Sequence, residues 1–432
     1  MVVTGRAVLL ALLATCAVAI SGQIGGTVTY VAGGLVVLLV VLDVALATSP
    51  RLMRLSREGD TSLRLGDSAS VSVLVSNPTG RRLRGSVRDA WPPSSHSAPK
   101  AQPLRVDAGE RRRVTTTLTP TRRGDARSAG VTVRSIGPLG LAGRQRTLRS
   151  LWVVRTLPPF HSRRHLPGKL SRLRELEGRH TAMVRGQGSE FDSLRDYVPG
   201  DDVRSIDWRA TARNDGVVVR TWRPERDRRI LIVLDTGRTS AGRVGDTPRL
   251  DHAMDAALLL TALAGKAGDR VDFMAYDRAV RAQVRASGKG SQVHRVVEAM
   301  APLEAELVES DPAGLVGTVL SQGRSRRLVV LLTDLNATAL EEGLLPRLPL
   351  LSSHHLLLVA GIKDPKVEEM ATERGSADAL YRAASAERTM SERHRISAEL
   401  RRMGAEVVDA DPERIAPALA DAYINLKAQG RL

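Results

Sequence analysis

Two aspartates in this sequence directly follow apolar segments of the kind that form buried strands. Asp235 ends the segment ILIVLD, and Asp334 ends the segment RLVVLLTD. A carboxylate in such a position offers hard oxygen ligands to a divalent cation. It can equally accept hydrogen bonds from the first backbone N–H groups of a helix that follows it. The two residues by themselves leave both interpretations open.

The region that carries these aspartates, residues 229–432, alternates apolar segments with helical ones. The apolar segments are ILIVLD, VDFMAYD, RLVVLLTD, HLLLVAG and AEVVDA. Such an alternation predicts an α/β domain with a mostly parallel sheet that helices cover on both faces. Because ligands of these sheets bind at the carboxyl ends of the strands, we expect Asp235 and Asp334 to lie at the ligand-binding edge.

A second polar cluster lies in residues 186–222, which read GQGSEFDSLRDYVPGDDVRSIDWRATARNDGVVVRTW. A Pro-Gly turn precedes two candidate helix caps, Asp201 and Asp202, and GVVVRTW predicts a strand. The acidic side chains could form a catalytic site, but no nucleophile lies at a usable spacing from a base. We therefore expect a network of turn caps and ion pairs that docks this segment onto the next domain. The alternative is a docking surface for a partner centred on Trp208, because Trp and Arg dominate interface hot spots. The docking candidates are Glu190, Arg195, Asp201, Asp202, Arg204, Asp207 and Trp208.

This second cluster resembles the signature of the bacterial family called domain of unknown function 58. The resemblance implies an N-terminal membrane hairpin, a β domain, the signature segment and a C-terminal domain of von Willebrand factor type A type, in that order. The residues that carry the match are Gly188, Glu190, Phe191, Arg195, Tyr197, Gly200, Asp201, Asp202, Arg204, Asp207, Trp208 and Ala212.

The same resemblance implies a place for a metal. In the von Willebrand type A fold, the two aspartates are similar to corners of the metal-ion-dependent adhesion site, whose first loop reads Asp-x-Ser-x-Ser. Here Thr239 keeps a hydroxyl, Gly237 has none, and Arg238 adds a charge that opposes a cation. Ser291, in GKGSQ, is the candidate for the hydroxyl of the second loop. The implied ion is Mg²⁺ or Mn²⁺, held by Asp235, Thr239, Ser291 and Asp334.

The N-terminus contains two uncharged apolar segments, residues 7–20 and 28–42. With their small flanking residues, both approach the length that crosses a bilayer, so we expect a hairpin of two spans. Arg6 precedes the first segment, Arg51, Arg54 and Arg57 follow the second, and the connecting turn carries no charge. By the positive-inside rule we expect both ends and the rest of the chain in the cytoplasm. Asp43 is expected at headgroup level. Two alternatives stay open: LLATC resembles a lipoprotein cleavage box ending at Cys16, and the first segment alone resembles a signal peptide.

Residues 61–155 carry period-two segments, such as ASVSVLV and VTTTLT, between turns rich in Gly, Pro, Asn and Asp. This pattern predicts about seven antiparallel strands in a sandwich of immunoglobulin-like type. The expected organisation is a membrane hairpin, a β-sandwich, a linker, the signature segment and the α/β domain. Their boundaries are residues 1–50, 51–157, 158–185, 186–228 and 229–432.

The formal net charge of +17 is concentrated in the middle of the chain. Residues 51–228 contain 36 basic and 18 acidic side chains, whereas residues 229–432 contain 27 and 28. A block of this kind suggests an anionic partner, either lipid or nucleic acid. Aromatic residues make up only 3% of the chain, so nucleic-acid binding is disfavoured for lack of stacking surfaces. Cys16 is the only cysteine, which excludes thiolate metal clusters.

These features favour a membrane-tethered cytoplasmic scaffold or adaptor that binds a protein partner through its α/β domain. The family resemblance implies that this partner is a MoxR-type AAA+ ATPase acting in assembly of an envelope complex. We expect no enzymatic activity, since the sequence has no P-loop, zinc-protease helix or nucleophile elbow. The alternatives are an enzyme that uses carboxylates of the signature segment, and a binder of anionic lipid or nucleic acid through the basic block.

Overall fold

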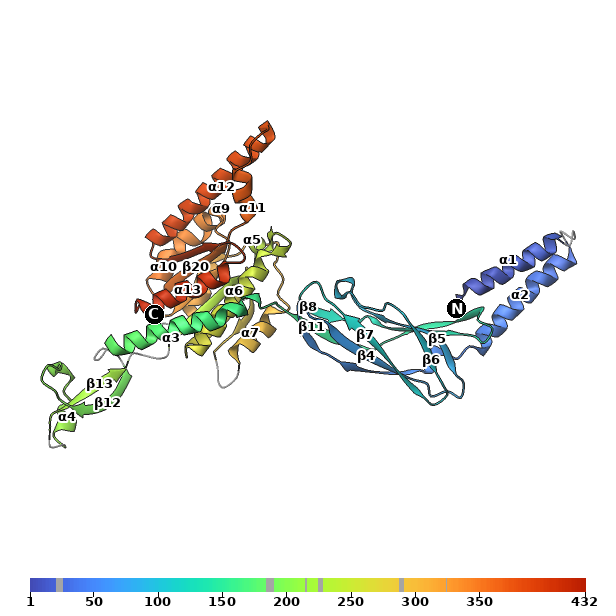
Figure 1. The fold of residues 1–432 in the computed structure, drawn as a ribbon, viewed down its shortest axis with the longest axis horizontal. Coiled ribbons are helices and arrows are strands. Elements are labelled where there is room, and N and C mark those ends of the chain that lie inside the picture. The colour runs from blue at the N-terminus through green and yellow to red at the C-terminus, as the bar shows by residue number, and fades with distance from the viewer. Residues whose placement is uncertain (21–25, 184–189, 214–215, 224–227, 287–290, 324) are drawn as a thin grey trace. The chain divides into compact units, whose positions relative to one another are not determined.

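The computed structural model describes residues 1–20, 26–183, 190–213, 216–223, 228–286, 291–323 and 325–432. The chain forms two compact units, Met1–Pro159 and Phe160–Leu432 (Figure 1).

The first unit begins with two apolar helices, α1 (Gly5–Ile20) and α2 (Thr27–Leu46), which pack against each other. Together with the short helix η1 (Pro50–Leu52), α2 gives a stretch of 26 residues, Thr27–Leu52, whose most apolar 18 residues have a mean hydropathy of 2.5. Among the described residues this is the one helix that is long and apolar enough to cross a membrane. At 16 residues α1 is shorter.

The rest of the first unit consists of β-sheets, as the period-two pattern predicted. One sheet has the order β2-β4-β7, the next β1-β10-β9-β5-β6, and the third β3-β11-β8. The pairs are antiparallel except for β3 and β11, which are parallel. The strands are β1 (Val2–Val3), β2 (Arg54–Gly59), β3 (Ser62–Arg64), β4 (Ala69–Ser76), β5 (Leu83–Ala90), β6 (Gln102–Val106), β7 (Arg111–Leu118), β8 (Gly124–Arg127), β9 (Gly130–Ile136), β10 (Ala142–Leu148) and β11 (Val153–Leu157).

A shared core joins the first two of these sheets. Val73 and Val114 point inward from β4 and β7, and Val87 and Val133 point inward from β5 and β9. All four side chains are at most 7% exposed. Residues 54–157, all described, contain ten strands rather than about seven, because the breaks at residues 60–61 and 119–123 set off the short strands β3 and β8.

One arginine that the sequence analysis assigned to the membrane flank has a different place. Arg57 lies inside the β-rich unit, where its guanidinium forms a bidentate ion pair with Asp89 at 2.6 and 3.0 Å. The side chains are 2% and 3% exposed. Trp91 and Ser128 donate further hydrogen bonds to Asp89, at 2.7 and 3.2 Å. A buried guanidinium that is paired with a carboxylate cannot face lipid headgroups, so Arg57 does not belong to the expected basic flank of the apolar segments.

The second unit contains the expected α/β region. Its sheet has the order β18-β17-β14-β19-β20-β21, and all neighbours are parallel except β18, which runs antiparallel to β17. The strands are β14 (Arg229–Asp235), β17 (Arg270–Tyr276), β18 (Val280–Val284), β19 (Leu328–Leu332), β20 (Leu356–Ile362) and β21 (Glu406–Ala410).

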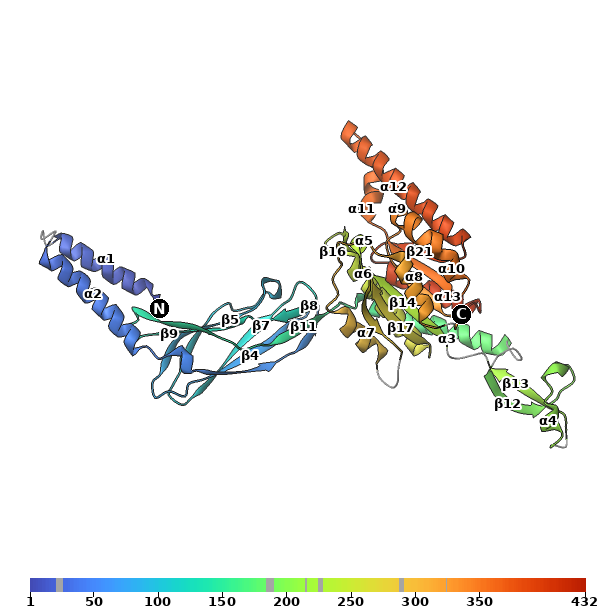
Figure 2. The same cartoon turned by 180° about the vertical axis from the view of Figure 1, so that it is seen from behind.

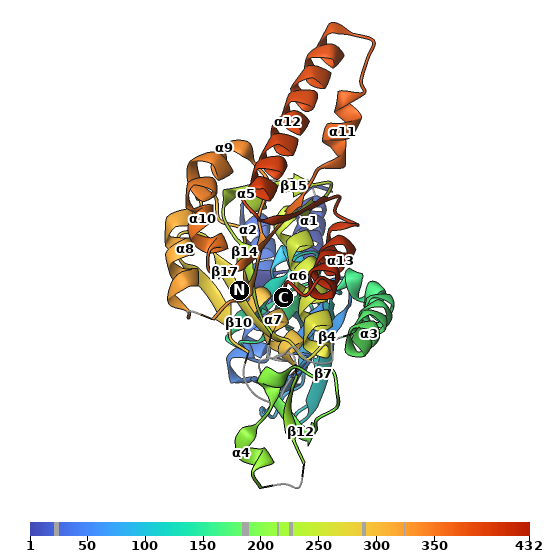
Figure 3. The same cartoon turned by 90° about the vertical axis from the view of Figure 1, so that its left-hand side faces the viewer.

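Helices cover both faces of this sheet, as Figure 3 shows with the sheet seen nearly edge-on. On one face lie α6 (Arg249–Lys266) and α13 (Ile415–Ala428). On the other face, α8 (Pro312–Ser321), α10 (Leu348–Ser352) and the C-terminal half of α12 (Ala377–Arg402) share a core with the strands. The remaining helical segments are α5 (Arg238–Ala241), α7 (Gln292–Met300), α9 (Ala337–Ala339), η5 (Leu340–Leu344), η6 (Leu345–Arg347) and α11 (Pro365–Ala371), and a two-residue pair, β15 (Arg243–Val244) and β16 (Thr247–Pro248), precedes α6.

Part of the segment expected as a linker is helical and belongs to the second unit. It forms η3 (His161–His165) and α3 (Leu166–Met183). Lys169 and Arg172 of α3 pair with Asp421 of α13 at 2.6 and 2.9 Å, and Ser162 bonds to Asp255 of α6. The segment therefore packs against the helices of the α/β region.

The signature segment forms a strand hairpin of its own (Figure 2). β12 (Glu190–Asp196) pairs antiparallel with β13 (Val218–Arg223), and η4 (Val203–Ser205) and α4 (Trp208–Thr211) lie between them. The segment before β12, residues 184–189, lies outside the described residues.

Candidate functional site

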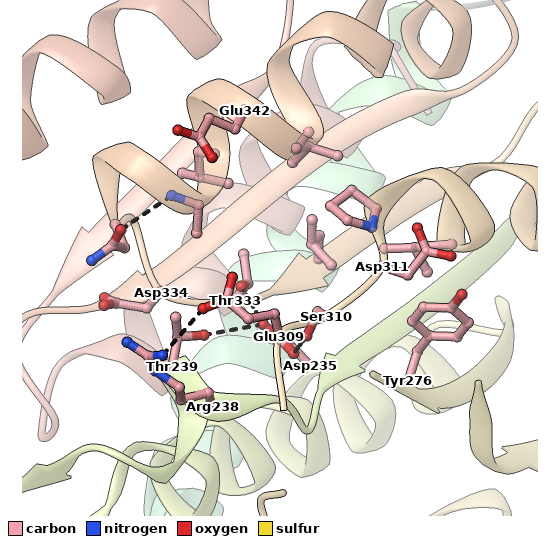
Figure 4. A pocket seen from close by; sticks show the side chains of 18 of the residues that line it. Asp235, Arg238, Thr239, Tyr276, Glu309, Ser310, Asp311, Thr333, Asp334 and Glu342 are labelled. Atoms are coloured by element: carbon pink, nitrogen blue, oxygen red, sulfur yellow. Dashed lines mark hydrogen bonds and ion pairs between the residues drawn. The ribbon is translucent and has the colours of Figure 1, made fainter. Parts of the chain in front are cut away.

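Asp235 is the centre of the polar cluster at the carboxyl edge of the sheet. It is the last residue of β14, the strand between β17 and β19, and only 8% of it is exposed. Its carboxylate accepts hydrogen bonds from the Ser310 hydroxyl and the Thr333 hydroxyl, both at 2.6 Å, and from the backbone N–H of Gly237 at 2.9 Å (Figure 4). The Thr239 hydroxyl is 3.4 Å away. Three loops thus bring oxygen atoms to one carboxylate.

Ser310 reaches this site because the long connection between α7 and α8 is pinned to the sheet edge. Backbone hydrogen bonds of 2.8 Å join Arg238 N–H to the Val308 carbonyl, and Asp311 N–H to the Asp277 carbonyl. Sequence reasoning missed both Ser310 and Thr333. Thr333 had a visible signal, since it precedes Asp334 at the end of an apolar strand, whereas no local pattern marked Ser310.

The prediction for Ser291 was wrong. Ser291 caps α7, where its hydroxyl accepts from His294 N–H, and the neighbouring Gln292 bonds to the carbonyl of Val271 at the start of β17. That end of β17 pairs with the start of β14, five residues before Asp235, or roughly 16 Å away at about 3.3 Å per residue. The reason is that β18 runs antiparallel to β17 and returns the chain to the amino edge of the sheet before Ser291.

Asp334 lies at the expected edge but already has cationic partners. Arg393 of α12 approaches its carboxylate to 2.8 Å, and Arg249 of α6 approaches it to 3.4 Å. Arg393 also makes two bonds of 2.8 Å to Asp409. Burial opposes the charge of Arg393, but the hydrogen bonds and charges of Asp409 and Asp334 outweigh burial and raise the pKa of the guanidinium. Asp334 therefore acts as a buried ion-pair partner, and its charge is largely neutralised.

The oxygen set at Asp235 suits a small hard cation but is sparse. It offers one carboxylate and the hydroxyls of Thr239, Ser310 and Thr333, and water would have to complete an octahedral shell. Within the described residues, no group of three or more His, Cys, Asp and Glu side chains could hold a metal. Arg238 is turned toward Glu309, 3.3 Å away, and its side chain is 66% exposed. Mg²⁺ or Mn²⁺ would thus be held by Asp235 and these three hydroxyls.

Beside Asp235 the edge opens into a pocket of about 420 Å³. Figure 4 shows polar side chains of Asp235, Ser310, Asp311 and Glu342 around it. Its inner wall is apolar and comes from β14, β19, α8 and η5. These wall residues are Val233, Leu315, Leu331, Leu340 and Leu344. A concave apolar space with few polar groups at its mouth is typical of a binding site.

The signature segment forms caps and ion pairs. Arg195 holds Asp201 in a bidentate pair at 2.6 and 2.8 Å, and its hydrogen bonds lower the pKa of the Asp201 carboxyl. Asp207 caps α4 through the N–H groups of Arg209 and Ala210, each at 3.0 Å. Arg220 lies 2.7 Å from Asp207, and these bonds together lower the pKa of Asp207. Asp202 caps η4 by accepting from the N–H of Arg204 at 3.0 Å.

Large apolar side chains of the same segment are exposed. Trp208 is 66% exposed, and Val203, Val198 and Leu194 are 62%, 57% and 42% exposed. We call these four residues the Trp208 surface. The exposed Arg204 borders it, whereas the side chain of Glu190 lies outside the described side chains. Exposed apolar patches with polar rims mark interaction sites.

A protein-family model matches the part of the chain that contains these sites. The family model described as "Protein of unknown function DUF58" matches residues 193–422, from the signature hairpin to α13. The chain belongs to this family. Both Asp235 and the Trp208 surface therefore lie inside the DUF58 region.

Relatives of this DUF58 protein include two uncharacterized mycobacterial proteins, Mb1516 of Mycobacterium bovis and Rv1480 of Mycobacterium tuberculosis. Each is 26% identical over 197 residues, which is 45% of this chain and 61% of the relative. Among solved structures, the CARDB domain of PF1109 from Pyrococcus furiosus is 15% identical with a TM-score of 0.19, covering 26% of this chain and 90% of that chain. The RO (RSR) protein of Deinococcus radiodurans is 15% identical with a TM-score of 0.22, covering 49% of this chain and 36% of that chain.

Proposed function

We propose that this DUF58 protein is a membrane-tethered cytoplasmic scaffold or adaptor that binds a protein partner at the carboxyl edge of its α/β unit. The observation that carries the proposal is the pocket of about 420 Å³ beside Asp235, where an apolar wall meets a polar mouth. A partner side chain that fills an apolar pocket is the usual anchor of a protein interface. The polar mouth, and a cation bound there, would orient the partner.

Under this proposal the α/β unit has a von Willebrand type A-like fold. The antiparallel edge strand β18, the Asp235 loop and the hydroxyl of Ser310 on a separate loop support it. The β-rich unit is then a sandwich of immunoglobulin-like type, and the core shared by the five-stranded sheet and the β2-β4-β7 sheet supports that assignment.

The tether in this proposal is a hairpin of two spans, α1 and α2, with both ends in the cytoplasm. The apolar composition of both helices and the arginines Arg6, Arg51 and Arg54 at their outer ends support this orientation. It puts both soluble units on the side of the membrane where a cytoplasmic ATPase would be available.

A second contact of the same partner is the Trp208 surface. The nearby carboxylates of Asp201 and Asp207 are bound within the signature segment by Arg195 and Arg220, and the indole of Trp208 is exposed. A MoxR-type AAA+ ATPase is the partner that the family resemblance implies, acting in assembly of an envelope complex. This part of the proposal rests on analogy.

Site-specific photo-crosslinking in the native host tests the proposal. A photoreactive residue is placed at Thr338 on the pocket rim, at Trp208, and at His294 on the opposite sheet edge as a control. We expect a MoxR-type ATPase to be crosslinked at positions 338 and 208 and not at 294. Equal crosslinking at all three positions, or none to such an ATPase at 338, would refute the proposed docking edge.

A further inference from the structure

The last turn of α2 is joined to the β-rich unit by a buried carboxylate. Asp43 has no exposed surface, and it accepts backbone N–H groups from Leu139 and Leu141 at 2.7 Å and from Ala142 at 2.8 Å. A Cβ on Gly137 would overlap Asp43, so the close approach of this turn requires glycine. Because its carboxylate accepts three N–H groups, Asp43 connects α2 to the β-rich unit. The sequence had instead suggested a charge at headgroup level.

The start of α1 is held at the same turn between β9 and β10. Val2 and Val3 pair with Gly143 and Ala142 as strand β1. The Thr4 hydroxyl bonds to the carbonyl of Gly140 at 2.6 Å, and Thr4 N–H bonds to the Leu141 carbonyl at 2.9 Å. On the α2 side, Arg144 donates to the carbonyl of Val44 at 2.9 Å. Both outer ends of the apolar helices are therefore fastened to one turn, which fixes the helices relative to the β-rich unit.

This attachment determines how deep the β9–β10 turn lies in the membrane when α2 spans it. Asp43 lies three residues before the end of α2 at Leu46, or about 4.5 Å along the helix axis. When α2 crosses a bilayer, its last turn lies among the headgroups, and the tip of the β9–β10 turn then lies there too. The tip residue Leu139 is 46% exposed, and Leu52 of η1, which packs against β9 and β10, is 57% exposed. Both are apolar side chains suited to the headgroup boundary.

The exposed charges at the end of the β-rich unit next to α1 and α2 are positive. Residues 1–57 contain a single acidic side chain, the buried Asp43, together with Arg6, Arg51 and Arg54 and the internally paired Arg57. Residues 126–152, which include β9 and β10, contain five arginines and no Asp or Glu. Each basic residue near an anionic bilayer surface contributes about 1 kcal/mol of attraction.

We propose that this end of the β-rich unit is a lipid-contacting surface for an anionic bilayer, formed by Arg6, Arg51, Leu52, Leu139 and Arg144. Asp43 holds it at headgroup depth, so that the two leucines enter the boundary and the arginines face lipid phosphates. The proposal rests on the crossing of the membrane by α2. The β-rich unit is then seated on the membrane rather than suspended from a free linker.

The test uses the full chain with Cys16 replaced by serine and single nitroxide-labelled cysteines. Two labels are placed at Leu139 and at Val37, which is exposed on α2. The third is placed at Arg122, at the end of the β-rich unit away from α2. Arg122 follows Thr121, whose backbone N–H bonds to the Ser94 carbonyl. Collision rates with oxygen and with a water-soluble nickel chelate are measured in phosphatidylcholine vesicles with and without phosphatidylglycerol. We expect positions 37 and 139 to favour oxygen, position 122 to favour nickel, and position 139 to move deeper with phosphatidylglycerol.

The outcomes distinguish a failure of the proposed lipid-contacting surface from a failure of the proposed membrane span of α2. A water-exposed label at 139 with a lipid-exposed label at 37 overturns the surface and leaves the span in place. Water exposure at both positions overturns both. In the Asp43→Ala variant the nickel accessibility at 139 is expected to rise to that at 122, while 37 stays in lipid. An unchanged depth at 139 in this variant would overturn the role of Asp43.

Discussion

The hydroxyl of Ser310 fills the space that a side chain on Gly237 would need. Gly237 stands where the adhesion-site motif has a serine, which the sequence suggested was a lost ligand. The structure places another hydroxyl there from a loop 73 residues further along the chain, and it bonds to Asp235 at 2.6 Å. Glycine at 237 is thus a condition for the arrangement of oxygens at Asp235.

Restoring the motif residue is therefore expected to damage the site. Gly237→Ser should displace Ser310 and lower the stability of the α/β unit by about 1–3 kcal/mol, the usual cost of overpacking. Calorimetric melting of the full chain measures the loss. Gly265→Ala is the matched control, since nothing lies within 4 Å of its added Cβ near the end of α6. A Gly237→Ser protein that melts with the parent would show that the space is not filled as described.

Isothermal titration of Mg²⁺ or Mn²⁺ into the full chain tests the cation site. We expect weak binding, with a Kd on the order of 10⁻³ M, because the oxygen set described at this site contains one carboxylate, that of Asp235. Asp235→Ala should abolish the heat and Ser310→Ala should reduce it, whereas Ser291→Ala at the opposite edge should leave it unchanged. Absence of heat in the parent, or equal heat in Asp235→Ala, would remove the cation from the proposed docking site.

Among the charged residues at the carboxyl edge of the sheet, Arg393 is expected to be the one whose removal lowers the stability of the α/β unit most. Arg393→Ala leaves the carboxylates of Asp334 and Asp409 without their shared partner, and these side chains are only 9% and 16% exposed. The expected loss of stability is about 3 kcal/mol. Arg388→Ala on the same helix is the control, because its pair with Glu392 is largely exposed and such pairs contribute under about 1 kcal/mol. Similar melting temperatures for the two variants would contradict this assignment.

His355 should make the stability of the α/β unit depend on pH. It is 3% exposed, and neither ring nitrogen has a hydrogen-bond partner among the described residues. Burial, followed by the nearby charges of Arg327 and His354, lowers its pKa. The unfolded chain then binds a proton that the folded chain does not, so stability falls as the pH drops below about 6.5 and levels off below the folded pKa.

The variant His355→Leu is expected to reduce this loss of stability, which melting curves between about pH 5 and pH 8 would measure. Some slope should remain, because burial also lowers the pKa of His252. His294→Ala, at an exposed position of α7, is the control and should keep the parent's slope. A steeper slope in His355→Leu would refute the sign of the effect.

The sequence by itself determined the elements and much of their order. The strand that ends at Asp235, the helix that follows and the cap at Asp202 all follow from patterns within a few residues. Periodicity and capping are local properties, since a residue's place on a strand or at a helix start depends on its near neighbours in the chain. For the same reason the signature was sufficient to identify the family.

Only the tertiary structure decided which of these residues meet. Ser310 reaches Asp235, and Asp43 is enclosed by a turn about 96 to 99 residues away, through loops whose course no local pattern specifies. Ser291 was misplaced because the direction of β18 depends on its pairing with β17, and Arg57 because its partner Asp89 lies on another strand. Contacts between distant segments depend on how sheets and helices pack, and that packing is a property of the whole chain.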